Sequence, residues 1–445
     1  NLLNNLEYLD VGYTYSTTLP EITNLNKLKH LDASYLPIIN VDSIYSQVAS
    51  ANKLSYLDLS GIDLGYQDFS ILNTLPLVTL KLENTHINSV DFYQWEDLEV
   101  LDLSNNNDLT LGWMPSGLRE LYLRHATGFD SLPGELDNLK ALDVSYTDLQ
   151  FENVQNVLSN TRRLHALGIA GIDVPDYFGM YDIVMAVGDN RLNLRYLDVS
   201  DLGILGFDGV NEFVGLERLI AKNLKGGYLD LGLTNLLELD LSGSEIDSSN
   251  VESITLNNPN LHTLRLNDID LSGIDIFSIL EQNNTQIVEL ELKGTGIPQV
   301  QISNNGLFQQ LVRLNISGIH LVELPIALMS PTLQYLDISH NDISSLAGLP
   351  IGLKGLDAGF NPIENSSDIV GLSRLGSLSL TNTNVDNVDF LYNLLYLQSL
   401  NLSSINITDK ASLMEGIAGL GLLRELDLSG LNLVGPNFYD ADFNL

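Results

Sequence analysis

Aspartate recurs at one position of a short phrase that is repeated along the whole chain. The phrase reads LSYLDLSGIDL at 54–64, LRYLDVSDLGI at 194–204 and LQYLDISHNDI at 333–343. The acidic position is occupied in these copies: Asp10, Asp32, Asp58, Asp102, Asp143, Asp198, Asp240, Asp337, Asp357 and Asp427, with Glu291 as the equivalent glutamate. Regularly spaced carboxylates could bind basic groups of a partner, coordinate Ca²⁺, or hydrogen-bond within the protein itself.

The sequence lacks the residue patterns that catalysis requires. There is no cysteine, which excludes thiol nucleophiles, disulfides and thiolate metal sites. The chain has no phosphate-binding loop, no G-x-S-x-G turn and no H-E-x-x-H pair, and its seven histidines are scattered. We therefore predict a protein that is not an enzyme and that needs no cofactor, with calcium as the one open alternative.

The last residues carry an incomplete metal motif. Asp440, Asp442 and Asn444 have the D-x-D-x-N spacing that begins a calcium-binding loop. Leu445 stands where such a loop needs glycine, and the chain ends there. These three residues are the metal-ligand candidates.

The composition limits the partners. The formal net charge of the 445-residue chain is −36 and its pI is about 4.2. A surface this acidic repels nucleic acid and anionic lipid, and favours cationic partners or divalent cations. No apolar run is long enough to cross a bilayer. We predict neither a nucleic-acid partner nor a membrane span.

The aspartates belong to a pattern L-x-x-L-x-[LVIA] that covers the chain in nineteen copies, which we call rungs. Their first residues are Leu6, Leu28, Leu54, Leu77, Leu98, Leu118, Leu139, Leu164, Leu194, Leu216, Leu236, Leu261, Ile287, Leu311, Leu333, Leu353, Leu375, Leu397 and Leu423. The pattern resembles the leucine-rich-repeat family, whose unit has 20–29 residues. Short units such as MPSGLREL at 114–121 resemble the bacterial type of this family, as in internalin-like adhesins.

The resemblance implies an α/β solenoid shaped as a horseshoe or arc. A single short strand cannot bury the leucines at its fourth and sixth positions, but stacked strands can. The strands should pair in parallel and line a concave face, with mixed helical and extended returns on the convex side. Apolar spacing predicts helical returns at 43–53, 154–163, 277–285 and 410–420, whereas the short rungs 98–117 and 333–352 should return by extended or 3₁₀ segments.

The ninth position departs from the family pattern. Asn106, Asn341 and Asn361 match its asparagine, but about half of the rungs carry isoleucine or leucine there, as at Ile62. An aliphatic residue cannot satisfy the backbone groups of the turn. Either backbone bonds suffice at those rungs, which we favour, or a neighbouring residue such as Asp63 turns inward.

The third and fifth positions should face outward on the concave wall. The candidate ligand-binding residues there are Tyr8, Asp10, His30, Asp32, Tyr56, Asp58, Tyr196, Asp198, Tyr335, Asp337 and Asp357. Aromatic side chains beside charged ones are common anchors of protein interfaces. The alternatives are an ordinary solvated surface, hydrogen-bonded to neighbouring rungs, and calcium binding along the wall.

Charges alternate in sign along the middle of the wall. The residues concerned are Arg218, Lys222, Glu238, Asp240, Arg265, Glu289, Glu291, Lys293 and Arg313. We expect a ladder that neutralises itself; the alternative is a charged footprint for a partner.

We predict one continuous repeat domain over 1–445, with no recognisable capping helix at either end. It would be a recognition scaffold that binds a protein or glycan through its acidic concave face, in an extracellular or cell-surface protein such as an adhesin. One alternative is a structural subunit of an extracellular filament, sheath or surface layer, self-associating end to end or bridged by calcium. Another is an intracellular regulator or a secreted effector.

Overall fold

The computed structural model describes residues 3–65, 72, 74–90, 92, 95–132, 136–226, 229–283, 286–297, 310–325 and 328–431. The chain divides into two units, Asn1–Leu224 and Lys225–Leu445, and each is described by itself. Both units are built from the repeated phrase. Each rung contributes one three-residue strand, and the first described strand already lies within the first rung.

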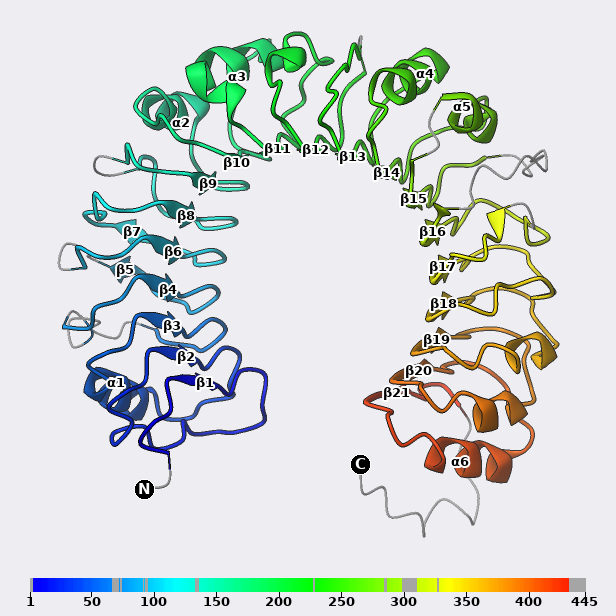
Figure 1. Cartoon of the computed structure of the whole chain (residues 1–445). Coiled ribbons are helices and arrows are strands. Elements are labelled where there is room, and N and C mark those ends of the chain that lie inside the picture. The colour runs from blue at the N-terminus through cyan, green and yellow to red at the C-terminus, as the bar shows by residue number, and fades with distance from the viewer. Residues whose placement is uncertain are drawn as a thin grey trace. The chain divides into compact units, whose positions relative to one another are not determined.

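In unit 1, successive rungs place their strands side by side in parallel (Figure 1). Each central leucine pairs with the central leucine of the next strand, and these side chains point into the core because neighbouring strand positions alternate between faces. The strands are β1 (Tyr8–Asp10), β2 (His30–Asp32), β3 (Tyr56–Asp58), β4 (Thr79–Lys81), β6 (Val100–Asp102), β8 (Glu120–Tyr122), β9 (Ala141–Asp143), β10 (Ala166–Gly168), β11 (Tyr196–Asp198) and β12 (Arg218–Ile220).

Unit 2 repeats this construction, with Leu239, Leu264 and Leu290 among the buried central leucines. Its strands also pair in parallel and without register shifts, as the common spacing of the phrase predicts. They are β13 (Glu238–Asp240), β14 (Thr263–Arg265), β15 (Glu289–Glu291), β16 (Arg313–Asn315), β17 (Tyr335–Asp337), β18 (Gly355–Asp357), β19 (Ser377–Ser379), β20 (Ser399–Asn401) and β21 (Glu425–Asp427).

Helices occupy the returns on the side opposite the strands in each unit (Figure 1). All four predicted helices are present, as α1 (Val41–Ser50), α2 (Phe151–Leu158), α5 (Ile276–Asn283) and α6 (Lys410–Ala418). Two further helices were not predicted: α3 (Met180–Val187) and α4 (Ser248–Asn257). Most residues in and next to α3 in the sequence are apolar, so no helical spacing of apolar residues stands out there. The α4 segment contains few apolar residues. The side chain of Asp247 caps α4 by accepting from the backbone N of Asn250, and this D-x-x-N pattern was the available signal.

The two short rungs return without a helix. Within the 98–117 rung, β7 (Thr110–Leu111) pairs with β5 (Ser89–Val90) of the preceding rung in a second, two-stranded sheet. The return of the 333–352 rung consists of extended chain and turns. Both match the expectation of an extended return, because a helix needs more residues than these rungs supply.

From the second rung to the eighteenth, the ninth position is buried whether it is polar or aliphatic. The side-chain amide of Asn341 donates to the carbonyls of Ile316, Ile338 and Ser339 at 2.9–3.2 Å. At an aliphatic rung, the backbone N of Ile62 bonds to the carbonyl of Leu59 at 3.2 Å. The side chain of Asp63 stays exposed, as do those of Asp173, Asp270 and Asn406. Backbone bonds therefore serve those rungs, as we favoured.

Candidate binding surface

Every aspartate of the repeated phrase hydrogen-bonds to its own rung. In Asp198, Oδ1 accepts from the backbone N of Ser200 at 3.1 Å and from its hydroxyl at 2.7 Å. All ten aspartates accept the same backbone bond from the residue two positions later, at 2.9–3.1 Å. Contacts with neighbouring rungs, which we also expected, occur at some aspartates through Oδ2, as between Asp58 and Lys81 and between Asp198 and Arg124. These carboxylates shape the turn that follows the strand.

The turn has the same conformation in every rung. The eighth residue of all nineteen rungs has a positive φ between 51° and 75°, and it is either glycine or a residue such as Tyr35, His125 or Asn223. Asparagine replaces the aspartate at Asn315 and Asn401 and makes the same backbone bond, at 3.0 and 2.9 Å. The hydrogen bond therefore needs a side-chain oxygen but no charge, and Oδ2 of each aspartate takes no part in it. The turn also forms without this bond, as in the rungs that carry Lys81, Gly168 or Ile220 at the fifth position.

The first three rungs of unit 1 bring six of the candidate residues together. The ring of His30 stacks on Tyr8 and Tyr56, with ring centroids 4.0 and 3.8 Å apart. Two positions along the same strands, Asp10, Asp32 and Asp58 lie in register. We call these six residues the acidic–aromatic cluster. The ring of Tyr8 ends the stack with 58% of the residue exposed.

A cation borders this cluster on the fourth rung. The Nζ of Lys81 lies 3.9 Å from Oδ2 of Asp58 and 5.7 Å from the centroid of the Tyr56 ring. Burial lowers the pKa of His30 below its ordinary value of 6.5, although the charges of Asp32, Asp10 and Asp58 oppose this shift. The imidazole is therefore neutral near pH 7 and stacks as an uncharged ring.

The second candidate pair, Tyr196 and Asp198, is already engaged within unit 1. Arg124 places Nη1 3.6 Å from Asp143 and 3.4 Å from Asp198, two rungs apart, and it can reach both because Gly168 has no side chain between them. Only 4% of Asp198 is exposed. The Tyr196 ring is covered by the guanidinium of Arg218, 5.4 Å from its centroid. These two residues present little surface to a partner.

The third group, Tyr335, Asp337 and Asp357, lies in unit 2. The guanidinium of Arg313 covers the Tyr335 ring at 4.3 Å from its centroid. Burial raises the pKa of Asp337 above its ordinary value, although its bonds to Ser339 oppose this. Asp337 and Asp357 lie in register on adjacent strands. Of the three groups of candidate residues, the acidic–aromatic cluster includes the exposed residues Tyr8 and Asp10, although only 7% of Asp58 is exposed.

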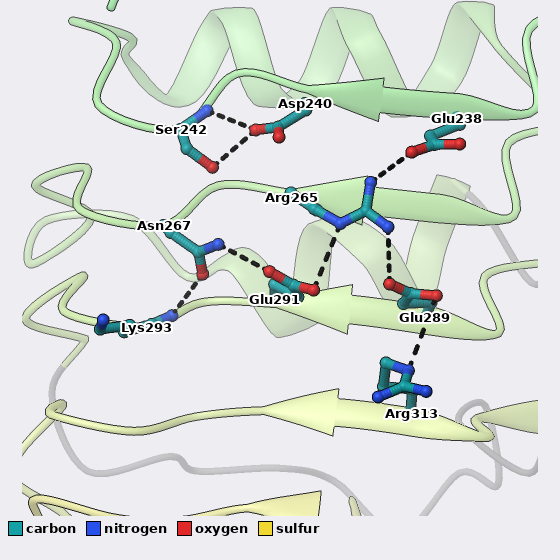
Figure 2. Close-up of polar contacts among 9 residues, drawn as sticks. All are labelled: Glu238, Asp240, Ser242, Arg265, Asn267, Glu289, Glu291, Lys293 and Arg313. Atoms are coloured by element: carbon teal, nitrogen blue, oxygen red, sulfur yellow. Dashed lines mark hydrogen bonds and ion pairs between the residues drawn. The ribbon is translucent and has the colours of Figure 1, made fainter. Parts of the chain in front are cut away.

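The alternating charges of unit 2 form a self-neutralising ladder, as expected (Figure 2). Arg265 contacts a carboxylate oxygen of Glu238, and it lies 2.7 Å from Glu289 and 3.2 Å from Glu291. Glu289 also lies 3.9 Å from Arg313. The amide of Asn267 bonds to Glu291 at 2.7 Å and accepts from the backbone N of Lys293 at 2.9 Å. One arginine thus compensates acids on the rungs at both sides.

No metal site is assigned. Across the described ranges, no group of three histidine, aspartate or glutamate side chains could hold a metal ion. The motif at Asp440, Asp442 and Asn444 lies outside the described residues, so calcium binding stays a prediction.

In the part of the chain that the structure describes, no helix has both the length and the apolarity needed to cross a membrane.

The repeat architecture matches solved structures. TLR13, solved in complex with ssRNA13, superposes with a TM-score of 0.53 and 19% identity, over 94% of this chain and 69% of that one. The chain has the leucine-rich-repeat fold. Lower scores relate it to a leucine-rich-repeat protein of Leptospira interrogans (0.40; 20% identity; 98% and 92% covered) and to mouse RP105 with MD-1 (0.46; 16%; 95% and 82%).

Sequence similarity to known proteins supports the fold less strongly than the structural similarity does. No family model matches this chain. Protein PAC2 of Saccharomyces cerevisiae is 26% identical over 362 residues, which cover 80% of the chain. The chain spans 59% of the length of that relative.

Sequence reasoning missed several residues that shape the binding surface. Lys81 and Arg124 decide which aspartates stay open, and neither followed from the aspartate column alone. The eighth position also carries ring pairs, since Tyr13 stacks on Tyr35 and His340 on Phe360, at 4.7 and 4.1 Å between centroids. Aromatic residues at this one repeat position on consecutive rungs were the signal for those stacks.

Proposed function

We propose that this protein is a non-enzymatic recognition scaffold that binds a protein partner through the acidic–aromatic cluster. The observation that carries this proposal is the alignment of three carboxylates, Asp10, Asp32 and Asp58, beside the stacked rings of Tyr8, His30 and Tyr56. Strands in a sheet lie about 4.8 Å apart, so the three carboxylates form a short row of negative charge.

The chemistry of the row favours a basic segment of a protein. Each aspartate uses Oδ1 for its turn, which leaves Oδ2 of Asp10 and Asp32 to accept from a lysine or arginine side chain. Asp58 adds its negative charge to the row, but only 7% of it is exposed, and its Oδ2 already lies 3.4 Å from the Tyr56 hydroxyl and 3.9 Å from Lys81. The aromatic stack offers an adjacent apolar surface, and an arginine can also stack on a tyrosine ring. Two unit charges about 5 Å apart repel by roughly 1 kcal/mol in water, so a cationic partner would relieve repulsion within the row.

We place this function in a secreted or cell-surface protein whose repeats form one continuous domain over 1–445. The strongly negative net charge and the absence of cysteine support that placement. A glycan partner is the alternative, and the same experiment separates the two. The stacked rings of the acidic–aromatic cluster could pack against a neutral sugar, but its three carboxylates would contribute little to binding one.

Asparagine substitution isolates charge from structure, because Asn315 and Asn401 keep the turn bond in the same column. The triple variant D10N/D32N/D58N should fold like the parent and lose the charge row. A random dodecapeptide display library is panned on the full chain, and recovered peptides are synthesised for fluorescence anisotropy. We expect peptides rich in lysine and arginine, and binding weakened about tenfold or more by the triple variant.

The matched control is D427N, which changes the same repeat position on a distant rung of the sequence. It should leave the affinity of these peptides unchanged. The proposal is wrong if the recovered peptides bind the triple variant as well as the parent. Binding to neutral oligosaccharides on a glycan array, with no peptide selected, would replace the protein partner by a glycan.

A further inference from the structure

A hollow of about 610 Å³ lies in unit 2, where the chain enters β18, β19 and β20. Tyr335 and Tyr396 belong to its lining, and so do the basic residues Lys354 and Arg374. Its volume lies within the range of about 300–1,000 Å³ that is usual for ligand sites.

Missing side chains create the hollow. Gly376 belongs to the lining and has no side chain, and Ser377 beside it is small. A Cβ on Gly355 would lie 2.9 Å from Cδ1 of Tyr335, so the tyrosine ring rests against this glycine. A Cβ on Gly376 would meet nothing closer than 3.6 Å, so space remains open there.

The hollow carries two cations, Lys354 and Arg374. Within the described part of the chain, neither Lys354 nor Arg374 forms an ion pair, and both are exposed. Arg265 and Arg124, by contrast, each contact two or more carboxylates. Two positive charges beside aromatic rings favour an anionic ligand with an apolar part.

We infer that this hollow binds a carboxylate side chain of an acidic peptide segment, between Tyr335 and Tyr396 and against Lys354 and Arg374. This deepens the proposed scaffold function and rests on it, by adding a second contact of opposite charge to the acidic–aromatic cluster. Arginine binds carboxylates with two parallel donors, and the tyrosine rings suit the apolar part of the peptide. A sugar would find only Ser377 and Gln398 as neutral polar side chains apart from the two tyrosine hydroxyls.

The test uses the full chain and labelled hexapeptides, N-acetylated and C-amidated, with glutamate fixed at one central position and apolar residues varied around it. The same set with glutamine is the uncharged probe. Fluorescence anisotropy should detect binding of glutamate peptides, weakened about tenfold by K354Q/R374Q. G376L should also abolish binding by filling the hollow, with no change of charge.

The matched control is K140Q/R163Q. Lys140 and Arg163 hold the same two repeat positions on adjacent rungs of unit 1, so this variant removes the same net charge elsewhere. It should leave the affinity of the glutamate peptides within about twofold, because neither residue belongs to the lining of the hollow. Thermal unfolding of G376L checks that its loss of binding is not loss of fold.

The inference is overturned if glutamate and glutamine peptides bind alike, or if K354Q/R374Q and K140Q/R163Q weaken binding equally. A phosphoserine peptide or an acidic oligosaccharide that binds where glutamate peptides do not would also overturn it. Failure of this inference is distinguishable from failure of the proposed function. If only the hollow does not bind glutamate peptides, the basic peptides would still bind the parent, and D10N/D32N/D58N would still weaken that binding.

Discussion

The hydroxyl of Tyr146 donates a hydrogen bond of 2.5 Å to Oδ2 of Asp201, two rungs further along unit 1. The ring passes over Gly171 on the rung between them, and a Cβ on that glycine would lie 2.4 Å from Cδ1 of the ring. On its other side the ring stacks on His125, with centroids 4.7 Å apart. The eighth repeat position thus ties four consecutive rungs together through one tyrosine.

Replacing Gly171 by alanine should destabilise unit 1 by about 1–3 kcal/mol, because the tyrosine must move and φ at this residue is +60°. Chemical unfolding followed by circular dichroism measures the loss. In a Tyr146→Ala background the same substitution should cost only roughly 1 kcal/mol, since the ring is gone. An equal cost in both backgrounds would contradict the packing explanation.

Substituting Asn341 by leucine should expose the structural role of the ninth position. Leucine is accepted there in other rungs, but Oδ1 of Asn341 accepts from the backbone N of Ile319 and Leu321 at 3.1 and 3.0 Å. Leaving these buried groups unpaired should cost about 2–4 kcal/mol. Hydrogen exchange at those two amides should accelerate. For comparison, Thr383→Val removes one side-chain bond to the Leu380 carbonyl and should cost about 1 kcal/mol. Unchanged exchange rates at Ile319 and Leu321 in the Asn341 variant would refute the role of Asn341 as the acceptor for these two amides.

Removing Arg265 should leave three carboxylates facing one another. The variant R265Q should lose about 1–3 kcal/mol, between the values for exposed and buried pairs, because its side chain and those of its acidic partners are about one-fifth exposed. Urea unfolding at low and high salt tests this, and the loss should shrink as salt rises. Adding E289Q should recover part of the stability. A loss that does not depend on salt would mean that packing of the arginine stem is responsible.

Stability should depend on pH through His30. Burial lowers its pKa in the folded state below the ordinary 6.5, so the unfolded chain binds the proton more tightly. The free energy of unfolding should therefore fall as pH drops below about 6.5, and this component should vanish in His30→Phe, which keeps the stack. Comparing urea midpoints of the two proteins between pH 7.5 and 5 measures it. A His30 pKa at or above 6.5 by NMR titration would disprove the prediction.

Much of the architecture was predictable because it depends on local spacing. A leucine such as Leu57 or Leu336 can leave water only if the next rung covers it, so the period of the phrase already implies stacked parallel strands. The helix α6 followed from apolar residues at helical spacing. The helix α4 did not, because its stability comes from a cap and from packing against α5 rather than from its own pattern.

The candidate site was predictable only in part. The column of aspartates and the aromatic neighbours of Asp10 and Asp58 could be named from their positions. Whether each of these residues is accessible to a partner could not be predicted, because this depends on long side chains that reach across several rungs. Asp198 looks like Asp10 in the sequence, yet Arg124 closes it off.

The sequence by itself determined that this chain is a stack of leucine-rich repeats with a column of aspartates, because the leucines of each short repeat can be buried when successive rungs stack on one another. Only the tertiary structure decided which charged side chains pair within the protein and which remain accessible to a partner. Lys354 and Arg374 lie 20 residues apart in the chain and line one hollow, because consecutive rungs bring them side by side. Distances between side chains on different rungs are properties of packing, and no single rung contains them.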